Sequence, residues 1–283
     1  MKKIITLSLA AFLMLAGGTV RAGGPWASGK NHGYAKLGQR AIVGRNFFNL
    51  SGEIIPITTT GVYITSFYGE YGLTNRLTAR AYLPFYFRST LNEVRYEPSG
   101  RVVPGDVLNS VSDVDVSLSY ALIQGKPFAL GASLQLGLPV GNPGGGATGL
   151  LQSGDGEFNQ LLRLEAGYSF HPAPVFVHGS AGFNNRTRGF SDDLHFTLEG
   201  GITLRERVTL ILKSYAVIPL RNGDANLSTT GLFSNNIQYI SFGPEVNVRL
   251  AGEWGISAAI FGAGAGRNVL AAPSLESGVY VKF

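Results

Sequence analysis

The chain has 283 residues, of which 45% are hydrophobic and only 14% charged, with a formal net charge of +5 and no cysteine. A disulfide framework is therefore excluded. Beyond the N-terminal segment, no apolar run reaches the roughly 18 residues that a membrane-spanning helix needs.

The N-terminal segment is typical of a secretory signal peptide. Met1–Lys3 is basic, Ile4–Leu15 is apolar, and Val20–Ala22 resembles a small-residue cleavage site. We therefore predict a signal peptide at 1–22 and one β-barrel domain at 23–283. Removing the signal lowers the formal charge from +5 to +2, so the charge gives no reason to expect nucleic-acid binding.

After a lead-in that we place in the periplasm (23–32), apolar and polar residues alternate in segments of about 10 to 13 residues. A period of two predicts β-strands with one face in an apolar medium. About twelve strands are expected, at 33–45, 60–72, 77–88, 113–123, 127–139, 158–170, 175–187, 192–204, 207–219, 235–250, 254–266 and 274–283. An exported, aromatic-rich chain of this kind meets a membrane as a closed antiparallel barrel.

The connections between these segments alternate between short and long, as periplasmic turns and extracellular loops do in bacterial barrels. The long connections are 46–59, 89–112, 140–157, 220–234 and 267–273. The exception is 189–191, a short connection where a long one is due. A soluble sandwich has no reason to sort its loops in this way.

Parity within each segment predicts which side chains face lipid. In 113–123, for example, Val116, Leu118 and Tyr120 face outward, while Ser117 and Ser119 face inward. A charge on the lipid face costs about 2–4 kcal/mol at the midplane. The mid-strand charges all have inward parity: Lys36, Arg40, Glu70, Arg80, Arg163, Glu165, Glu199, Lys213, Glu245 and Arg249.

Seven inward residues are our candidates for lining the lumen: Glu70, Arg80, Arg163, Glu165, Ser180, Glu199 and Lys213. Counting back from the turns predicts Glu70 opposite Arg80 and a row of Glu165, Ser180, Glu199 and Lys213 across four strands. Two interpretations stay open for this row. It is either a set of ion pairs that fills and rigidifies the barrel or a polar constriction that selects what passes.

The last strand has an apolar face that runs to the final residue. Val279, Val281 and Phe283 share one parity with Leu275. This ending resembles the closing strand of bacterial outer-membrane barrels, in which it serves as a signal to the barrel-assembly machinery. The alternative is an ordinary edge strand of a soluble sheet.

Three prolines follow an apolar residue near the extracellular rim, at Pro84, Pro139 and Pro219. Because proline cannot donate to a β-ladder, we expect each to end its strand. The alternative is a break in the wall that connects the lumen sideways to the membrane.

Other candidate sites are weaker. The segment Gln152–Glu157 lacks the repeated ligands of a calcium loop and the Gly-Lys-Ser/Thr of a phosphate cradle, so we predict a flexible loop, no metal and no cofactor. His178 and Ser180 lie on one inward face, but same-face neighbours on a strand are about 7 Å apart. We therefore do not expect an enzyme, although a lipid-modifying barrel is the third alternative.

The segment Tyr68–Leu77, with its glutamate and Gly-Leu-Thr turn, and the following Leu83–Phe85 resemble the outer-membrane family named for the meta-pathway of phenol degradation. Leu138–Gly141 and Gln152–Gly156 match later landmarks of that family. This chain has Ser112–Asp115 where the family has Gly-Asp. The resemblance implies an outer-membrane barrel with a transporter-like role and supplies no catalytic residues.

The predicted function is passive or gated passage of small molecules, including apolar or aromatic ones, across the outer membrane of a Gram-negative bacterium. The alternative is a structural or surface-interaction barrel with a closed lumen. Apolar loop residues would either bind an apolar solute or pack together as a lid, and we favour the lid. These residues are Ile54, Ile55, Ile57, Leu150, Leu151, Leu232 and Phe233. The expected partners are membrane lipid, the assembly machinery and an unidentified solute.

Overall fold

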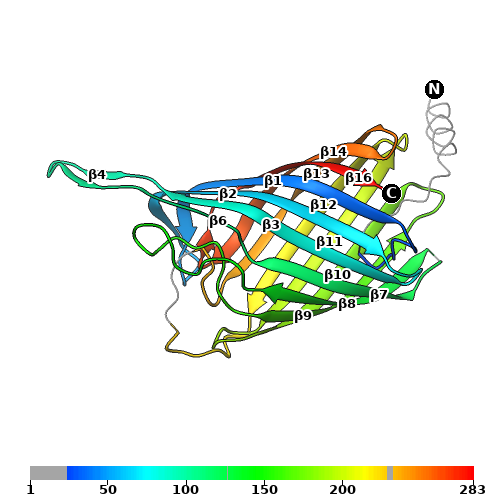
Figure 1. The fold of residues 1–283 in the computed structure, drawn as a ribbon, viewed down its shortest axis with the longest axis horizontal. Coiled ribbons are helices and arrows are strands. Elements are labelled where there is room, and N and C mark those ends of the chain that lie inside the picture. The colour runs from blue at the N-terminus through cyan, green and yellow to red at the C-terminus, as the bar shows by residue number, and fades with distance from the viewer. Residues whose placement is uncertain (1–23, 126, 228–231) are drawn as a thin grey trace, which may run out of the picture.

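The computed structural model describes residues 24–125, 127–227 and 232–283 and shows a closed antiparallel β-barrel (Figure 1). The first strand pairs with the second strand on one side and with the last strand on the other, which closes the sheet. The predicted signal peptide, 1–22, lies outside the described residues. In the part of the chain that is described, no helix is long and apolar enough to cross a membrane.

Twelve long strands form the wall, which confirms the predicted fold and order. They are β1 (Gly33–Phe48), β2 (Ile54–Gly72), β3 (Leu77–Leu91), β7 (Val114–Ile123), β8 (Phe128–Leu138), β9 (Asn159–Ser169), β10 (Val175–Arg186), β11 (Asp193–Leu204), β12 (Val208–Pro219), β13 (Gln238–Ala251), β14 (Trp254–Arg267) and β16 (Ser274–Lys282). Four short strands lie outside this set: β4 (Val94–Tyr96), β5 (Arg101–Val103), β6 (Asp106–Ser110) and β15 (Val269–Leu270).

The first hairpin extends further than its alternation pattern predicted. The expected loop 46–59 shrinks to a five-residue turn, because β1 and β2 stay paired up to Phe48 and Ile54. Asn49 stabilises this turn, since its Oδ1 accepts hydrogen bonds from the backbone N–H groups of Ser51 and Glu53, each at 2.9 Å. An Asn side chain that bonds its own turn in this way replaces the missing ladder contacts.

Exposure alternates along the wall as the inward and outward parity predicted. Outward Leu134 and Leu212 are 47% and 62% exposed, whereas inward Ser119 and Ser133 are 5% and 3% exposed. This inverts the pattern of a soluble protein and suits a wall surrounded by hydrocarbon.

The connections are sorted between the two ends of the barrel. The short turns lie at the end that carries the C-terminus, and the longer loops, with the protruding β4–β5 hairpin, lie at the other (Figure 1). We call these the periplasmic and extracellular ends, following the usual sorting in outer-membrane barrels.

Candidate functional site

A cavity of about 1020 Å³ occupies the periplasmic half of the barrel. Its lining runs from Arg207 and Lys282 at the periplasmic end to Thr197 and Glu276 at mid-height. All ten mid-strand charges with inward parity line it, and so do all seven lumen candidates: Glu70, Arg80, Arg163, Glu165, Ser180, Glu199 and Lys213.

One ion-pair group centres on Arg80 of β3. Arg80 lies directly opposite Glu70 on β2, in the predicted register, and its Nε is 3.8 Å from Glu70 Oε1. Its Nη1 reaches across to Glu165 Oε1 on β9 at 3.4 Å, and the same oxygen accepts a hydrogen bond from Ser133 at 2.9 Å. These residues join four strands from inside the barrel.

A second group centres on Lys213 of β12. Its Nζ lies 2.9 Å from Glu245 Oε2 and 3.8 Å from Glu199 Oε1. Glu199 is opposite Lys213 in the ladder, as predicted. On its other side, Glu199 Oε2 lies 3.9 Å from His178 Nδ1. Arg163 belongs to neither group, and its Nη1 donates to Gln135 Oε1 at 2.8 Å.

The predicted pairing of Ser180 with Glu199 is wrong. Ser180 lies opposite Glu165, as expected, but on the other side it lies opposite Thr197, while His178 takes the place opposite Glu199. The β10–β11 turn closes through the bond from Phe190 N to the Thr187 carbonyl, so its centre lies between residues 188 and 189, one residue before the centre that pairing Ser180 with Glu199 assumes. Moving the centre of a turn by one residue moves every partner by two.

Most of the N-terminal segment 24–30 lies inside the barrel, with Gly24 and Trp26–Ser28 lining the cavity, which corrects the assignment of this part as a periplasmic lead-in. Arg80 Nη2 donates to the Gly24 carbonyl at 2.6 Å, and Pro25 is fully buried. The Trp26 ring contacts Phe176 and His178 edge-on, with centroids 6.3 and 6.4 Å apart. This segment therefore narrows the periplasmic half of the lumen.

Two glycines of the wall make room for this segment. A Cβ on Gly131 would lie 3.3 Å from Pro25 Cα, and one on Gly167 would lie 2.3 Å from the Trp26 ring. Both glycines have inward parity on neighbouring strands. Inward glycines on two neighbouring strands are the only trace that the insertion leaves among the described residues of the wall, and with 39 glycines in the chain they do not predict it alone.

Loops at the extracellular end contact one another and the wall. The Ser112 hydroxyl donates to the Ser153 carbonyl, and Gln152 Oε1 accepts from Phe233 N at 3.1 Å. The Phe233 ring packs 6.0 Å from Phe87, and Leu151 is 5% exposed. Leu151 is therefore buried and Phe233 packs on the wall, which agrees with the favoured alternative of a lid for these two residues.

Other apolar residues expected in the loops stay accessible. Leu150 and Ile54 are each 60% exposed, and Ile54, Ile55 and Ile57 belong to β2 rather than to a loop. The lid therefore uses only part of the predicted apolar set.

The three rim prolines differ in position. Pro139 directly follows β8 and Pro219 is the last residue of β12, as expected. Pro84 lies within β3, which contradicts the prediction that it ends its strand. At this point β3 changes its partner strand. It pairs with β7 as far as Tyr82 and with β6 from Phe87 onward, so the missing N–H of proline costs no ladder bond.

The C-terminal residues occupy the seam where the barrel closes. In β16, Val279 lies opposite Leu37 of β1 and Val281 lies opposite Ala35 of β1. On their other side, both valines face residues of β14. Phe283 exchanges backbone hydrogen bonds with Gly33, at 2.7 and 3.1 Å, and its ring stacks on Tyr71 with centroids 6.5 Å apart.

Deleting Phe283, or replacing it with Ser, is expected to leave export intact and to impair outer-membrane assembly, because the closing residue and its ring contact are lost. Heat-modifiability on gels reports the folded fraction in membrane preparations. As a matched control, Phe170→Ser changes an exposed aromatic residue that also lies at the periplasmic end. Wild-type folding of both variants would rule out the assembly role.

Comparisons with solved structures find barrels of the same architecture. An outer-membrane channel from Pseudomonas putida F1 superimposes with a TM-score of 0.64 at 13% identity, over 93% of this chain and 100% of that one. The translocator domain of the autotransporter NalP from Neisseria meningitidis gives 0.54 at 13% identity, over 99% and 96%. The NanC porin gives 0.51 at 9%, over 87% and 100%. No family model and no curated protein sequence matches the chain. The chain has the fold of outer-membrane β-barrels.

Proposed function

We propose that the protein is an outer-membrane channel of a Gram-negative bacterium and that it passes small molecules through a gated lumen. The observation that carries the proposal is the cavity of about 1020 Å³, lined by charged and polar side chains, inside a closed wall. Narrow barrels are filled by packed side chains, so an internal polar cavity of this size favours passage. Two structural neighbours of the barrel, a channel and a porin, agree with this role.

The lining indicates the class of solute. Eight cationic and seven anionic side chains border the cavity, so neither sign of charge dominates. Aromatic side chains lie among them, including Tyr34, Tyr68 and Tyr82. Small polar or aromatic molecules suit such a surface better than purely apolar ones. The Tyr68–Leu77 resemblance supports a relation to the phenol meta-pathway family and hence an aromatic solute.

A structural barrel with a closed lumen is the second candidate. It is favoured by the obstruction at both ends: the 24–30 segment inside the periplasmic half and the interlocked loops at the extracellular end. The two candidates differ in whether removing an obstruction produces ion conduction.

Trp26→Ala is expected to raise single-channel conductance in planar bilayers several-fold above wild type, because the ring holds the 24–30 segment against Phe176 and His178. Trp254→Ala is the matched control, since the other tryptophan of the chain lies on the outer wall and is 57% exposed. It should conduct like wild type. Silence of wild type and Trp26→Ala, with both folded, would favour the structural barrel.

A further inference from the structure

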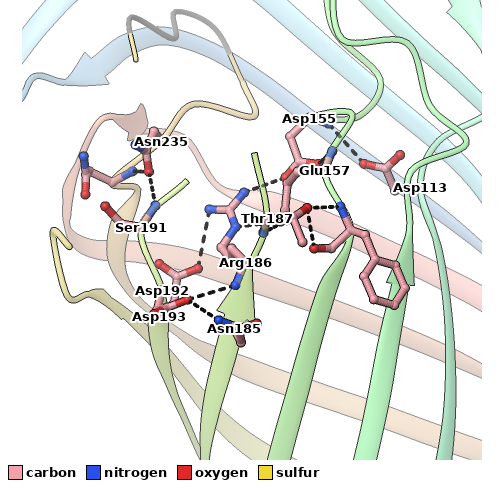
Figure 2. Close-up of polar contacts among 12 residues, drawn as sticks. Asp113, Asp155, Glu157, Asn185, Arg186, Thr187, Ser191, Asp192, Asp193 and Asn235 are labelled. Atoms are coloured by element: carbon pink, nitrogen blue, oxygen red, sulfur yellow. Dashed lines mark hydrogen bonds and ion pairs between the residues drawn. The ribbon is translucent and has the colours of Figure 1, made fainter. Parts of the chain in front are cut away.

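Arg186, at the extracellular end of β10, holds three carboxylates from two other segments (Figure 2). Its Nη2 lies 2.6 Å from Asp155 Oδ2, its Nε 2.7 Å from Glu157 Oε1, and its Nη1 3.5 Å from Asp193 Oδ2. Asp113 joins them, because its Oδ2 accepts from Asp155 N at 3.1 Å. We call these five residues the Arg186 cluster.

The Arg186 cluster carries more negative than positive charge. Three carboxylates contact one guanidinium, a fourth belongs to Asp113 beside Asp155, and the side chain of Glu157 is fully buried. Two further charged groups face it from the β10–β11 loop. Asp192 accepts a hydrogen bond from Arg186 N at 2.9 Å, and Arg188 lies beside Gly156. The free-energy cost of burying the ionised Asp155 carboxylate is therefore only partly compensated by Arg186.

The cluster fixes the loop that covers the extracellular end. Asp113 Oδ1 accepts from Gly141 N at 2.8 Å, so it binds both ends of the β8–β9 loop (139–158). Between these ends, Ser153 is fully buried and Gln152 bonds to the β12–β13 loop. Loosening the cluster would therefore release the part of the lid that the β8–β9 loop supplies.

We infer that the Arg186 cluster is a pH-sensitive closure that holds the β8–β9 loop over the extracellular mouth in acid and loosens it towards neutral and alkaline pH. The inference rests on the proposed channel function, for which it supplies a form of regulation. Its physical basis is the excess of carboxylates, which repel one another when all are ionised and cease to do so when one takes up a proton.

The direction follows from the loop carboxyls. Burial, only partly offset by Arg186, raises the pKa of Asp155 to about 6, and burial also raises the pKa of Asp113. A released loop would return Asp155 to its ordinary pKa near 3.8. The closed form thus binds the proton more tightly, and falling pH stabilises it. Between about pH 5 and pH 8, linkage at Asp155 alone shifts the balance towards release by about tenfold.

Asp106 supplies a contrast within the same lid. Its carboxylate accepts from the N–H groups of Ala147 and Thr148, each at 2.9 Å, and from the Thr148 hydroxyl. These hydrogen bonds, with those of Thr148 first, lower the pKa of Asp106 to about 2. Asp106 therefore stays ionised across the range in which Asp155 titrates, and it fastens the loop without sensing pH.

The test uses the absence of native cysteine. Ser153→Cys places a thiol at a buried position of the loop, and Leu150→Cys places one at a position that is 60% exposed. Both are labelled with a dipyridyl disulfide reagent, which stays reactive in acid. The rate at 153 relative to 150 is expected to rise about tenfold from pH 5 to pH 8. Amide hydrogen exchange of 139–158 in the unsubstituted protein, corrected for intrinsic rates, measures the same opening without a cysteine.

Two variants assign the pH dependence. Asp155→Asn should abolish most of it, whereas Asp106→Asn should speed labelling by the same factor at both pH values. The inference would be overturned if neither the labelling rate at 153 relative to 150 nor the amide exchange rate changed with pH. It would also be overturned if Asp155→Asn kept the full pH dependence. Conductance of Trp26→Ala is recorded at both pH values. If loop opening follows pH but no current flows at either, the pH-sensitive closure stands and the channel function fails.

Discussion

Leu198→Arg is expected to destabilise the barrel by about 2–4 kcal/mol, the cost of a lipid-facing arginine near the bilayer midplane. Leu198 is the sixth of twelve residues in β11, and its side chain is 64% exposed on the outer wall. The leucine contributes little packing inside the protein. Nearly all of the effect therefore arises from placing a guanidinium in hydrocarbon.

The adjacent residue is a matched control. Thr197 lies on the same strand, lines the cavity and faces Ser180 and Tyr215 across the ladder. Thr197→Arg should change the unfolding free energy by less than about 1 kcal/mol, since its side chain enters the polar lumen and avoids the lipid-facing cost. Urea titrations in lipid vesicles measure both. Equal losses for the two variants would show that the wall has no lipid-facing side at this height.

Pairings across the short periplasmic turns could be predicted from the sequence. Glu70 with Arg80 and Glu199 with Lys213 both flank such turns, and both pairs are found in the ladder. A side-chain period of two permits only registers that keep the charges inside, and a tight turn selects one of them. Parity and turn length together thus fix the register at this end of the barrel.

The register across longer connections and the position of the internal 24–30 segment could not be predicted from periodicity. The β10–β11 loop places Arg188 and Gly189 at positive φ, and it uses Asp192 to bind Asn185 and Arg186 N. These side-chain contacts, rather than periodicity, set the register that moved Ser180 away from Glu199. The 24–30 segment has no alternation at all, because it forms no strand and touches the inside of the wall through separate contacts. Neither feature leaves a repeat in the sequence.

Lys213→Glu is expected to cost about 3 kcal/mol, in the range for breaking a buried ion pair. The change removes the ammonium from Glu245 and Glu199 and sets a third carboxylate beside them. The cavity beside Lys213 screens part of this repulsion, so we expect the lower end of that range. If the group also lines the conducting path, the reversal potential in a salt gradient should move towards cation selectivity.

Two second-site reversals separate the contacts of Lys213. Adding Glu245→Lys should restore most of the lost stability, because it inverts the contact that spans 2.9 Å. Adding Glu199→Lys should restore less, since that contact spans 3.8 Å and Glu245 would still face the new carboxylate. Double-mutant cycles on the unfolding midpoint and the reversal potential give the coupling of each pair. If the pairs are coupled in the unfolding midpoint but not in the reversal potential, the group stabilises the wall without setting ion selectivity. If neither reversal recovers stability, these side chains do not meet in the folded barrel.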